Sequence, residues 1–451
     1  MAVKARIGTF AMFVVCAALA SPLPAPKPPK VSIDNVPLRD EKVAFNRTPV
    51  TARFASYAKG EQPQFKVSAL AGGQPAVGAT VEVSVSVPGE CKPETVAVKL
   101  DAQGQALLTI PSPDRPGWVF VRGVGDSASA AAGAMYDGDN IRASAPPPAD
   151  FKQFWADEIA ALKQVPIKAK LTEVEPIPSQ KGKIRTWEFE VSCAGPRPAT
   201  GYLSMPINAR PKSLPLIVGF NGAADASAYR SDHYGDVAIA VQANKFGIPN
   251  GLTDEQYQSE YYESDIKNYP MKGLDDPHTA MYKWIIVRHY RVLEYAKSLP
   301  GWNGKLLLLN GESFGGGQVL ILGALDPDVT FVSSCVPALC DHNGRLVGRC
   351  NGYPQFWNVD ENGGLPESMR KISENARYFD TMNFCTLFRP GQEVTIGTGF
   401  RDTLCPPDGV FAAYHNIPEG VKKTLWLNPV AGHDAGNWHA GKRIFELLGK
   451  E

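Results

Sequence analysis

Ser313 lies at the centre of the pentapeptide Gly311-Glu-Ser-Phe-Gly315, which directly follows the apolar run Leu306–Leu309. A buried strand followed by a glycine-flanked serine and an apolar helix is typical of a nucleophile elbow. Glycine is needed two residues before and two after the serine because a Cβ there would collide with neighbouring backbone. The sequence therefore predicts a serine nucleophile at a helix N-terminus, where free N–H groups and the helix dipole favour negative charge.

Two further residues follow Ser313 in the order that a serine, acid and histidine relay requires. Asp402 lies in the loop after the predicted strand 393–398, and His433 lies in a loop of small residues after the predicted strand 424–427. A carboxylate at the carboxyl end of a parallel strand can accept the Nδ1 proton of a histidine. The other ring nitrogen can then take the serine proton.

Both residues also have structural interpretations. Asp402 could cap the helix after Pro407 or pair with Arg401, but Asp408 is better placed as the cap. A lone histidine is more often a structural group than a catalyst. The nearest competitor of the loop histidine is His439, which falls within the last predicted helix.

Attack on an ester carbonyl places negative charge on its oxygen, and this charge needs two fixed N–H donors. The elbow supplies one donor from the backbone of Phe314. The second is expected from the loop 220–224, where the backbone N–H of Ala223 is the best candidate. No metal ion is needed for this chemistry.

Elements that could position these residues alternate along the segment 147–451. Predicted strands cover 184–191, 200–205, 214–220, 237–241, 305–309, 329–335, 393–398 and 424–427, and predicted helices cover 150–159, 279–298, the segment after Ser313, 408–415 and 438–448. Strand–helix repetition indicates a mostly parallel sheet covered on both faces. Eight strands with an elbow after the fifth predict an α/β-hydrolase domain.

The preceding segment, 32–142, has a different pattern. Short β-branched or alternating runs recur about every ten residues between turn signals, at 50–56, 65–70, 79–87, 95–100, 106–110 and 119–124. This pattern predicts a small all-β sandwich of immunoglobulin-like topology, with a spacer or packing role. Stretches rich in small residues or proline, at 126–133 and 143–148, indicate the boundary.

The N-terminus has the pattern of a secretory signal over residues 1–20, with cleavage after Ala20, followed by a Pro/Ala/Lys linker over 21–31. A secreted or periplasmic protein is therefore expected. Removing the signal leaves 44 Lys and Arg against 46 Asp and Glu. This balance argues against nucleic acid or a membrane surface as the main partner, because both attract a concentrated positive face. The residues leave the oligomeric state open.

Seven cysteines remain after removal of the signal, an odd number. Export makes disulfides possible, and buried free thiols are the equal alternative. None has the Cys-x-x-Cys spacing of a structural zinc site. They are Cys91, Cys193, Cys335, Cys340, Cys350, Cys385 and Cys405.

Several separated motifs together resemble the acetyl xylan esterase and cephalosporin-C deacetylase family over about residues 147–451. They are Phe151-x-x-Phe-Trp155, the Gly-Glu-Ser313-Phe-Gly-Gly elbow, Tyr378-Phe-Asp380, Asp402-x-x-Cys-Pro-Pro407 and Gly432-His433. The resemblance implies a serine esterase that removes acetyl groups from sugar hydroxyls, with the relay at Ser313, Asp402 and His433 and no cofactor. The chain departs from the family at Phe314, where members usually carry Gln, and at Ala223, where they carry an aromatic residue.

Two classes of function follow. The first is an exported deacetylase acting on acetylated xylan or xylo-oligosaccharides, with a carboxylesterase or glucuronoyl-type esterase of other substrate as its neighbour. The second is a carbohydrate-binding protein whose hydrolase domain is inert. The intact relay on the expected elements favours the enzyme, because a decayed enzyme would tend to lose it.

Overall fold

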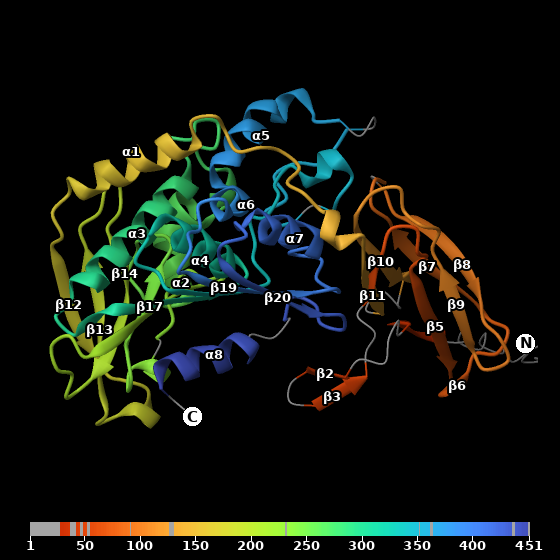
Figure 1. The fold of residues 1–451 in the computed structure, drawn as a ribbon, viewed down its shortest axis with the longest axis horizontal. Helices are drawn as coiled ribbons and strands as arrows, with labels where there is room; N and C mark the ends of the chain where they lie inside the picture. The colour runs from red at the N-terminus through yellow and green to blue at the C-terminus, as the bar shows by residue number, and fades with distance from the viewer. Residues whose placement is uncertain are drawn as a thin grey trace, which may run out of the picture.

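The computed structural model describes residues 28–36, 42–45, 48–51, 55–90, 92–125, 130–230, 232–350, 352–360, 364–434 and 438–449. The predicted signal peptide 1–20, most of the predicted linker 21–31 and Cys91 lie outside these residues. Figure 1 shows two units side by side, an N-terminal β-unit formed by strands β1–β11 and a larger C-terminal α/β unit. No described helix is long and apolar enough to cross a bilayer.

The β-unit contains two main sheets. One has the order β1-β5-β6 with β9 paired to β5, and the other has the order β4-β11-β10-β7-β8. Burial alternates along β5 and β7, so each presents every second side chain to a shared core. The strands are β1 (Lys30–Asn35), β2 (Lys42–Phe45), β3 (Thr48–Thr51), β4 (Ser56–Tyr57), β5 (Gln64–Ala71), β6 (Gln74–Pro75), β7 (Thr80–Ser86), β8 (Glu94–Lys99), β9 (Gln105–Thr109), β10 (Gly117–Gly123) and β11 (Ala131–Tyr136).

The α/β unit is built on one nine-stranded sheet with the order β12-β13-β14-β16-β15-β17-β18-β19-β20. Neighbours from β16 to β20 pair in parallel, and β12, β13 and β14 add an antiparallel edge. The strands are β12 (Ala169–Val174), β13 (Ile184–Val191), β14 (Ala199–Pro206), β15 (Leu214–Phe220), β16 (Ile239–Asn244), β17 (Trp302–Glu312), β18 (Phe331–Cys335), β19 (Glu393–Gly399) and β20 (Lys422–Asn428).

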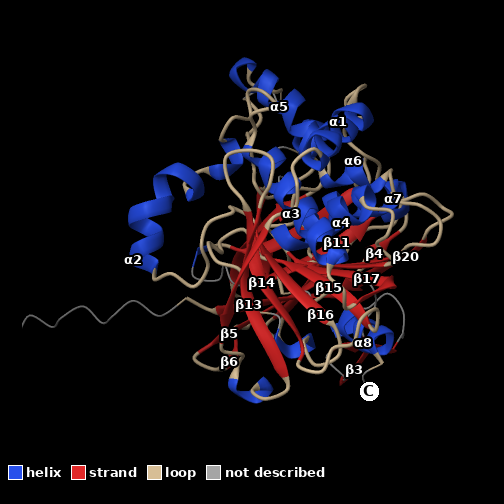
Figure 2. Ribbon diagram, turned by 90° about the vertical axis from the view of Figure 1, so that its left-hand side faces the viewer, coloured by secondary structure: helices blue, strands red, loops and turns tan. Residues whose placement is uncertain are grey.

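Helices cover both faces of this sheet. Figure 2 shows α1, α3, α4, α6 and α7 above the strands and α8 below them. On the α8 side, Ile444 and Leu448 pack against Ile217, Leu308 and Phe331 of the sheet. The helices are α1 (Phe151–Lys163), α2 (Asp254–Gln256) continued by a π-helix (Tyr257–Ile266), α3 (Met281–Ser298), α4 (Phe314–Leu325), α5 (Arg370–Ala376), α6 (Thr381–Cys385), α7 (Pro407–Asn416) and α8 (Trp438–Leu448).

The large, mostly parallel sheet agrees with the predicted α/β architecture, and three details of the prediction were wrong. The sheet has nine strands rather than eight, because β12 forms an additional edge, and the elbow therefore follows the sixth strand. The stretch 126–133, taken as a domain boundary, ends inside β11. The predicted linker 21–31 extends too far, because β1 begins at Lys30.

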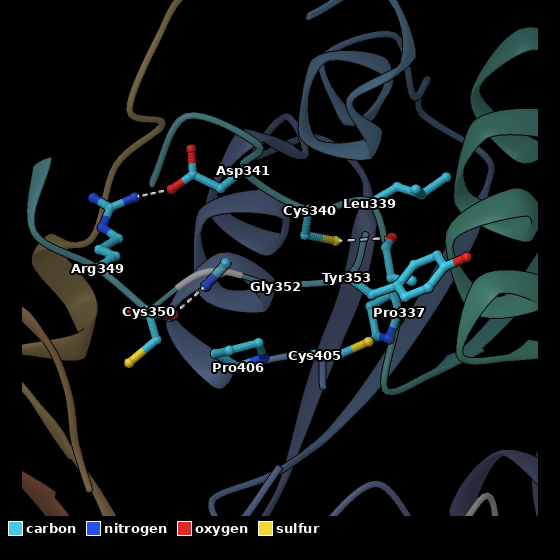
Figure 3. Close-up of a pocket in the computed structure, with 13 residues that line it drawn as sticks. Pro337, Leu339, Cys340, Asp341, Arg349, Cys350, Gly352, Tyr353, Cys405 and Pro406 are labelled. Carbon is cyan, nitrogen blue, oxygen red and sulfur yellow. Dashed lines mark hydrogen bonds and ion pairs between the residues drawn. The ribbon is translucent and has the colours of Figure 1, made fainter. Parts of the chain in front are cut away.

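The described cysteines are all free thiols. Figure 3 shows Cys340, Cys350 and Cys405 around a cavity of about 10 Å³ behind the loop that follows β19. Burial raises the pKa of Cys350 to about 12 and that of Cys335 also to about 12. These sulfur atoms therefore stay protonated and unreactive at neutral pH.

Candidate active site

The turn between β17 and α4 holds Ser313 in an unusual backbone conformation, with φ of 58° and ψ of −120°. A Cβ on Gly315 would lie 2.0 Å from the carbonyl oxygen of Phe220, and a Cβ on Gly311 would lie 2.4 Å from the carbonyl oxygen of Gly315. Both positions therefore require glycine, because no heavier residue allows strand and helix to approach so closely. The turn places the serine at the N-terminus of α4, as the sequence predicted.

Three side chains from different loops meet at this turn. The Nε2 atom of His433 lies 2.8 Å from the hydroxyl oxygen of Ser313, and its Nδ1 atom lies 2.9 Å from Oδ2 of Asp402. The other oxygen of Asp402 accepts hydrogen bonds from the backbone N–H groups of Leu404 and Cys405, each at 2.9 Å. Asp402 is fully buried, whereas 29% of the His433 side chain is exposed. The carboxylate is thus fixed by backbone donors, and the imidazole reaches the solvent-accessible side.

Charge around the imidazole favours its protonated form. The hydrogen bond with Asp402 raises the pKa of His433, against the opposing effect of desolvation, and the negative charges of Glu312 and Asp434 add to the rise. Desolvation in turn raises the pKa of the Glu312 carboxyl. An imidazolium formed beside Ser313 would therefore be stabilised from more than one side.

A pocket of about 660 Å³ opens in front of the serine. Ser313, His433 and the loop after β15 all line it. The remaining lining residues come from the ends of β15, β16 and β17 and from the segments that follow β15, β18 and β19. They are Phe220, Asn221, Gly222, Ala223, Ala224, Asp225, Tyr229, Gln242, Asn310, Gly311, Glu312, Tyr353 and Leu404.

The loop carrying Ala223 is hydrogen-bonded to a buried lysine. Lys245 is 2% exposed, and its Nζ atom donates to the carbonyl oxygens of Gly222, at 2.8 Å, and of Asp225. Burial lowers the pKa of Lys245 to about 7, although the charge of Asp225 opposes this. The lysine thus fixes the position of a loop that lines the pocket together with Ser313.

A second hollow of about 470 Å³ continues from the first and shares Ala224, Asp225 and Tyr229 with it. Its far wall is formed by the π-helix, through Tyr257 and Tyr262. Tyr229 is 62% exposed, and its hydroxyl donates to Asp225 at 2.6 Å. The site therefore extends as an open, tyrosine-lined groove.

Among the described residues, Asp402, Cys405 and His433 are the one group of three whose ligand atoms lie within 4.8 Å of one another. Both ring nitrogens of His433 already face hydrogen-bond partners, Asp402 and Ser313. The geometry of this group is accounted for by the hydrogen-bond relay.

All five residues predicted from the sequence thus lie in or beside one pocket. The sequence did not predict Glu312, although it stands inside the elbow motif, because its effect on His433 depends on a proximity that only the fold creates. It also missed Lys245, because a lysine at the end of a predicted strand gives no sign of being buried. Tyr229 carries no local signal either.

The family model of acetyl xylan esterase (AXE1) matches residues 138–450 of this chain. Acetyl esterase Axe7A of Xylanibacter ruminicola is 27% identical over 384 residues, which cover 84% of this chain and 84% of that protein. A match of this length extends beyond the segment 138–450 and so includes part of the β-unit.

Two solved structures share the fold of the α/β unit. Acetyl xylan esterase from Paenibacillus sp. R4 is similar with a TM-score of 0.58 at 21% identity, over 69% of this chain and 98% of that chain. Acetyl xylan esterase 1 from Thermoanaerobacterium sp. JW/SL YS485 is similar with a TM-score of 0.57 at 20% identity, over 69% of this chain and 97% of that chain. Both comparisons indicate an α/β-hydrolase fold.

Proposed function

The chain belongs to the acetyl xylan esterase family and is a carboxylic ester hydrolase, and on this basis we propose that it is an exported deacetylase of acetylated xylan or xylo-oligosaccharides. The observation that carries the proposal is the continuous chain of hydrogen bonds from Ser313 through His433 to Asp402 at the wall of an open pocket. In this proposal Ser313 is the nucleophile, His433 the general base and Asp402 the orienting acid.

The proposed reaction follows from what each atom can do. Nε2 of His433 takes the hydroxyl proton while Oγ of Ser313 bonds to the acetyl carbonyl carbon, and Asp402 stabilises the imidazolium. The tetrahedral intermediate collapses when His433 returns the proton to the departing sugar oxygen. Water then attacks the acetyl-enzyme by the same route and releases acetate, which regenerates the serine.

Backbone N–H groups are proposed to stabilise the negative oxygen of both tetrahedral intermediates. The first belongs to Phe314, at the N-terminus of α4, where the N–H groups of a helix have no partner within it. The second belongs to Ala223, which lines the same pocket as Ser313. Each such donor is worth on the order of 10²–10³ in rate.

The groove favours a carbohydrate as the partner. An acetyl group alone needs little of a pocket of about 660 Å³, and the adjoining hollow of about 470 Å³ continues the same surface. Tyrosine rings offer flat apolar faces together with hydroxyl groups, which suits sugar rings. The pocket is lined by Asp225, Glu312 and Tyr229, which offer polar contacts for a sugar.

The test compares the wild-type protein with Ser313→Ala on acetylated xylo-oligosaccharides and on short aryl esters. Ser213→Ala, at an exposed serine before β15, is the matched control. We expect acetate release by the wild type and the control and none above background by Ser313→Ala. Equal release by all three proteins would refute the mechanism, and activity confined to longer acyl esters or to glucuronoyl esters would assign a different substrate.

Export is a separate part of the proposal, since it depends on residues 1–20 alone. When the full chain is expressed with its own N-terminus in a secreting bacterium, the mature protein should begin at Ser21. N-terminal sequencing of the exported protein tests this expectation. A chain that stays in the cytoplasm with Met1 retained would contradict it.

A further inference from the structure

The β-unit contacts the loop that carries Asp402. The indole N–H of Trp118, on β10, donates to the carbonyl oxygen of Phe400 at 2.9 Å, across 282 positions of sequence. Trp118 is 3% exposed and Phe400 is fully buried, so this hydrogen bond is shielded from water. Phe400 stands two residues before Asp402.

Gly133, on the neighbouring strand β11, brings the β-unit even closer to the same peptide group. A Cβ on Gly133 would lie 1.7 Å from the carbonyl oxygen of Phe400 and 2.5 Å from the indole nitrogen of Trp118. The register places Gly133 opposite Phe120, in the middle of the β10–β11 pair. The strand backbone itself therefore forms the surface on which the Phe400 peptide rests.

The backbone at Phe400 and Arg401 is hydrogen-bonded to the loop that carries His433. The N–H of Phe400 donates to the carbonyl oxygen of Asn428 at 2.9 Å, and the N–H of Arg401 donates to that of Ala431 at 2.9 Å. Asn428 and Ala431 precede His433 in its own loop. A movement of Phe400 would therefore disturb the hydrogen bonds that set the acid loop against the histidine loop.

The β-unit also reaches the histidine loop directly. The side-chain amide of Asn35, at the end of β1, donates to the carbonyl oxygen of Pro429 at 3.2 Å. Asp34 lies 3.6 Å from Arg401, but its side chain is 60% exposed, so this ion pair contributes little.

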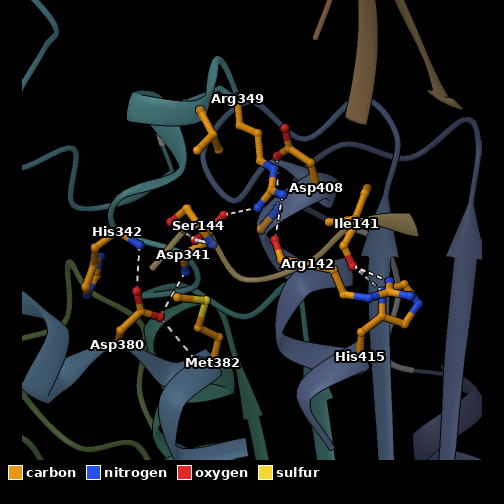
Figure 4. Close-up of polar contacts among 12 residues, drawn as sticks. Ile141, Arg142, Ser144, Asp341, His342, Arg349, Asp380, Met382, Asp408 and His415 are labelled. Carbon is orange, nitrogen blue, oxygen red and sulfur yellow. Dashed lines mark hydrogen bonds and ion pairs between the residues drawn. The ribbon is translucent and has the colours of Figure 1, made fainter. Parts of the chain in front are cut away.

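The segment that joins the two units is anchored as well. Figure 4 shows Ile141, Arg142 and Ser144 among side chains of the α/β unit. The N–H of Ser144 donates to Asp341 at 3.0 Å, and the carbonyl oxygen of Ile141 lies 2.9 Å from Nδ1 of His415. The β-unit is thus held on two sides, by this segment and by the Phe400 contact.

We propose that the β-unit is a positioning element of the active site, in which Trp118 and Gly133 fix the Phe400 peptide and thereby the distance between Asp402 and His433. The inference rests on the proposed roles of Asp402 and His433. It predicts that changes in the β-unit at this contact lower turnover of a folded enzyme, although they touch neither substrate nor the reacting atoms.

The sharpest perturbation is Gly133→Ala. A Cβ essentially never lies within about 3.0 Å of a non-bonded heavy atom, so the Phe400 carbonyl and β11 must separate by more than about 1 Å. A misplacement of this size in a catalytic constellation can cost about 10² in rate. We expect kcat to fall by about 10²-fold while KM changes less than about threefold, because the tyrosine-lined part of the groove contains no residue of the two loops that would move.

A pH profile separates positioning from general damage. The hydrogen bond with Asp402 contributes most to the raised pKa of His433, so a longer Asp402–His433 distance should lower that pKa. The rising limb of kcat/KM against pH should therefore move to lower pH in Gly133→Ala. A merely destabilised enzyme would keep the wild-type midpoint.

Trp118→Phe is the milder second variant, since it keeps an aromatic ring and removes the N–H donor. We expect a drop in kcat of about 10-fold in a protein that still folds. Val67→Ala is the matched control: it is a buried residue of β5 that takes no part in this contact. It should lower the unfolding temperature and leave kcat and the pH midpoint unchanged.

The outcomes are distinguishable from failure of the proposed function. If Ser313→Ala retains full activity, the mechanism is wrong whatever the β-unit does. If Ser313→Ala is inactive but Gly133→Ala and Trp118→Phe are folded and keep wild-type kcat and pH midpoint, the positioning role is wrong and the β-unit is a passive neighbour.

Discussion

Replacement of Lys245 by methionine should disable one proposed oxyanion donor without touching the relay. The Nζ atom of Lys245 binds the carbonyl oxygen of Gly222 at 2.8 Å, and this carbonyl belongs to the same peptide group as the N–H of Ala223. In a planar trans peptide the C=O and N–H bonds point in opposite directions. By holding the Gly222 carbonyl, the lysine would orient the Ala223 N–H in the opposite direction, which the proposed mechanism requires to be toward the pocket.

The magnitude follows from this geometry. Methionine has a similar length and no donor, so the Gly222 peptide is free to rotate toward water, and the loss is bounded by that of one oxyanion donor, on the order of 10²–10³ in rate. We expect kcat to fall by about 10²-fold. KM should change by less than about threefold, because the donor acts mainly on the charged intermediate.

The assay is the steady-state hydrolysis of an aryl acetate, measured across pH 6 to 9. Burial lowers the pKa of Lys245 to about 7, so the wild-type lysine loses a proton within this range. A neutral amine keeps two N–H groups for its two carbonyl acceptors, so wild-type turnover should not collapse above pH 7. The deficit of Lys245→Met should therefore persist at every pH.

Lys297→Met is the matched control for removing a lysine with internal partners, because the Lys297 side chain is only 16% exposed. Lys297 pairs at 2.6 Å with Asp326, at the far end of α4 from Ser313. Its loss leaves a buried carboxylate unpaired and should cost about 3–5 kcal/mol of stability, with kcat retained. A folded Lys245→Met enzyme with kcat within threefold of the wild type would refute the orienting role of the lysine.

Three further outcomes are expected. The rate should rise with pH through the pKa of His433, with a midpoint above the ordinary value of 6.5. In Asp402→Asn kcat should fall by about 10⁴ and the midpoint should move to lower pH. A pH–rate profile of this variant with an unshifted midpoint would contradict the expectation. Gly315→Ala should yield little folded protein in expression and circular dichroism trials, because its Cβ would lie 2.0 Å from the Phe220 carbonyl oxygen. Trp155→Ala should lower the free energy of unfolding in urea by about 3–5 kcal/mol without changing kcat of the folded fraction, since Trp155 is 1% exposed.

The sequence was most informative where a local pattern determines a local shape. The apolar run before Ser313 and the two flanking glycines predict both the strand and the turn, and the ends of parallel strands predict where Asp402 and His433 gather. Strand β12 was missed for a physical reason. It is an exposed edge strand, so it lacks the alternation of buried and exposed residues that reveals other strands.

Features that depend on distant segments could not be predicted in the same way. The hydrogen bond between Trp118 and Phe400 produces no periodic pattern in the sequence, because the residues around one of them give no information about the position of the other. Lys245 is similar, since its acceptors are backbone carbonyls, which every residue has.

The stretch of small residues around Gly133 shows how composition can mislead. Alanine and glycine between two regular segments are typical of a boundary, and the stretch was interpreted as one. In the structure the last three residues of the stretch, 131–133, belong to β11, and the register pairs Gly133 with the large side chain of Phe120 and Ala131 with that of Arg122 on β10. A larger residue at Gly133 would push the Phe400 peptide away, so the small residue is there to permit contact between the two units rather than to separate them.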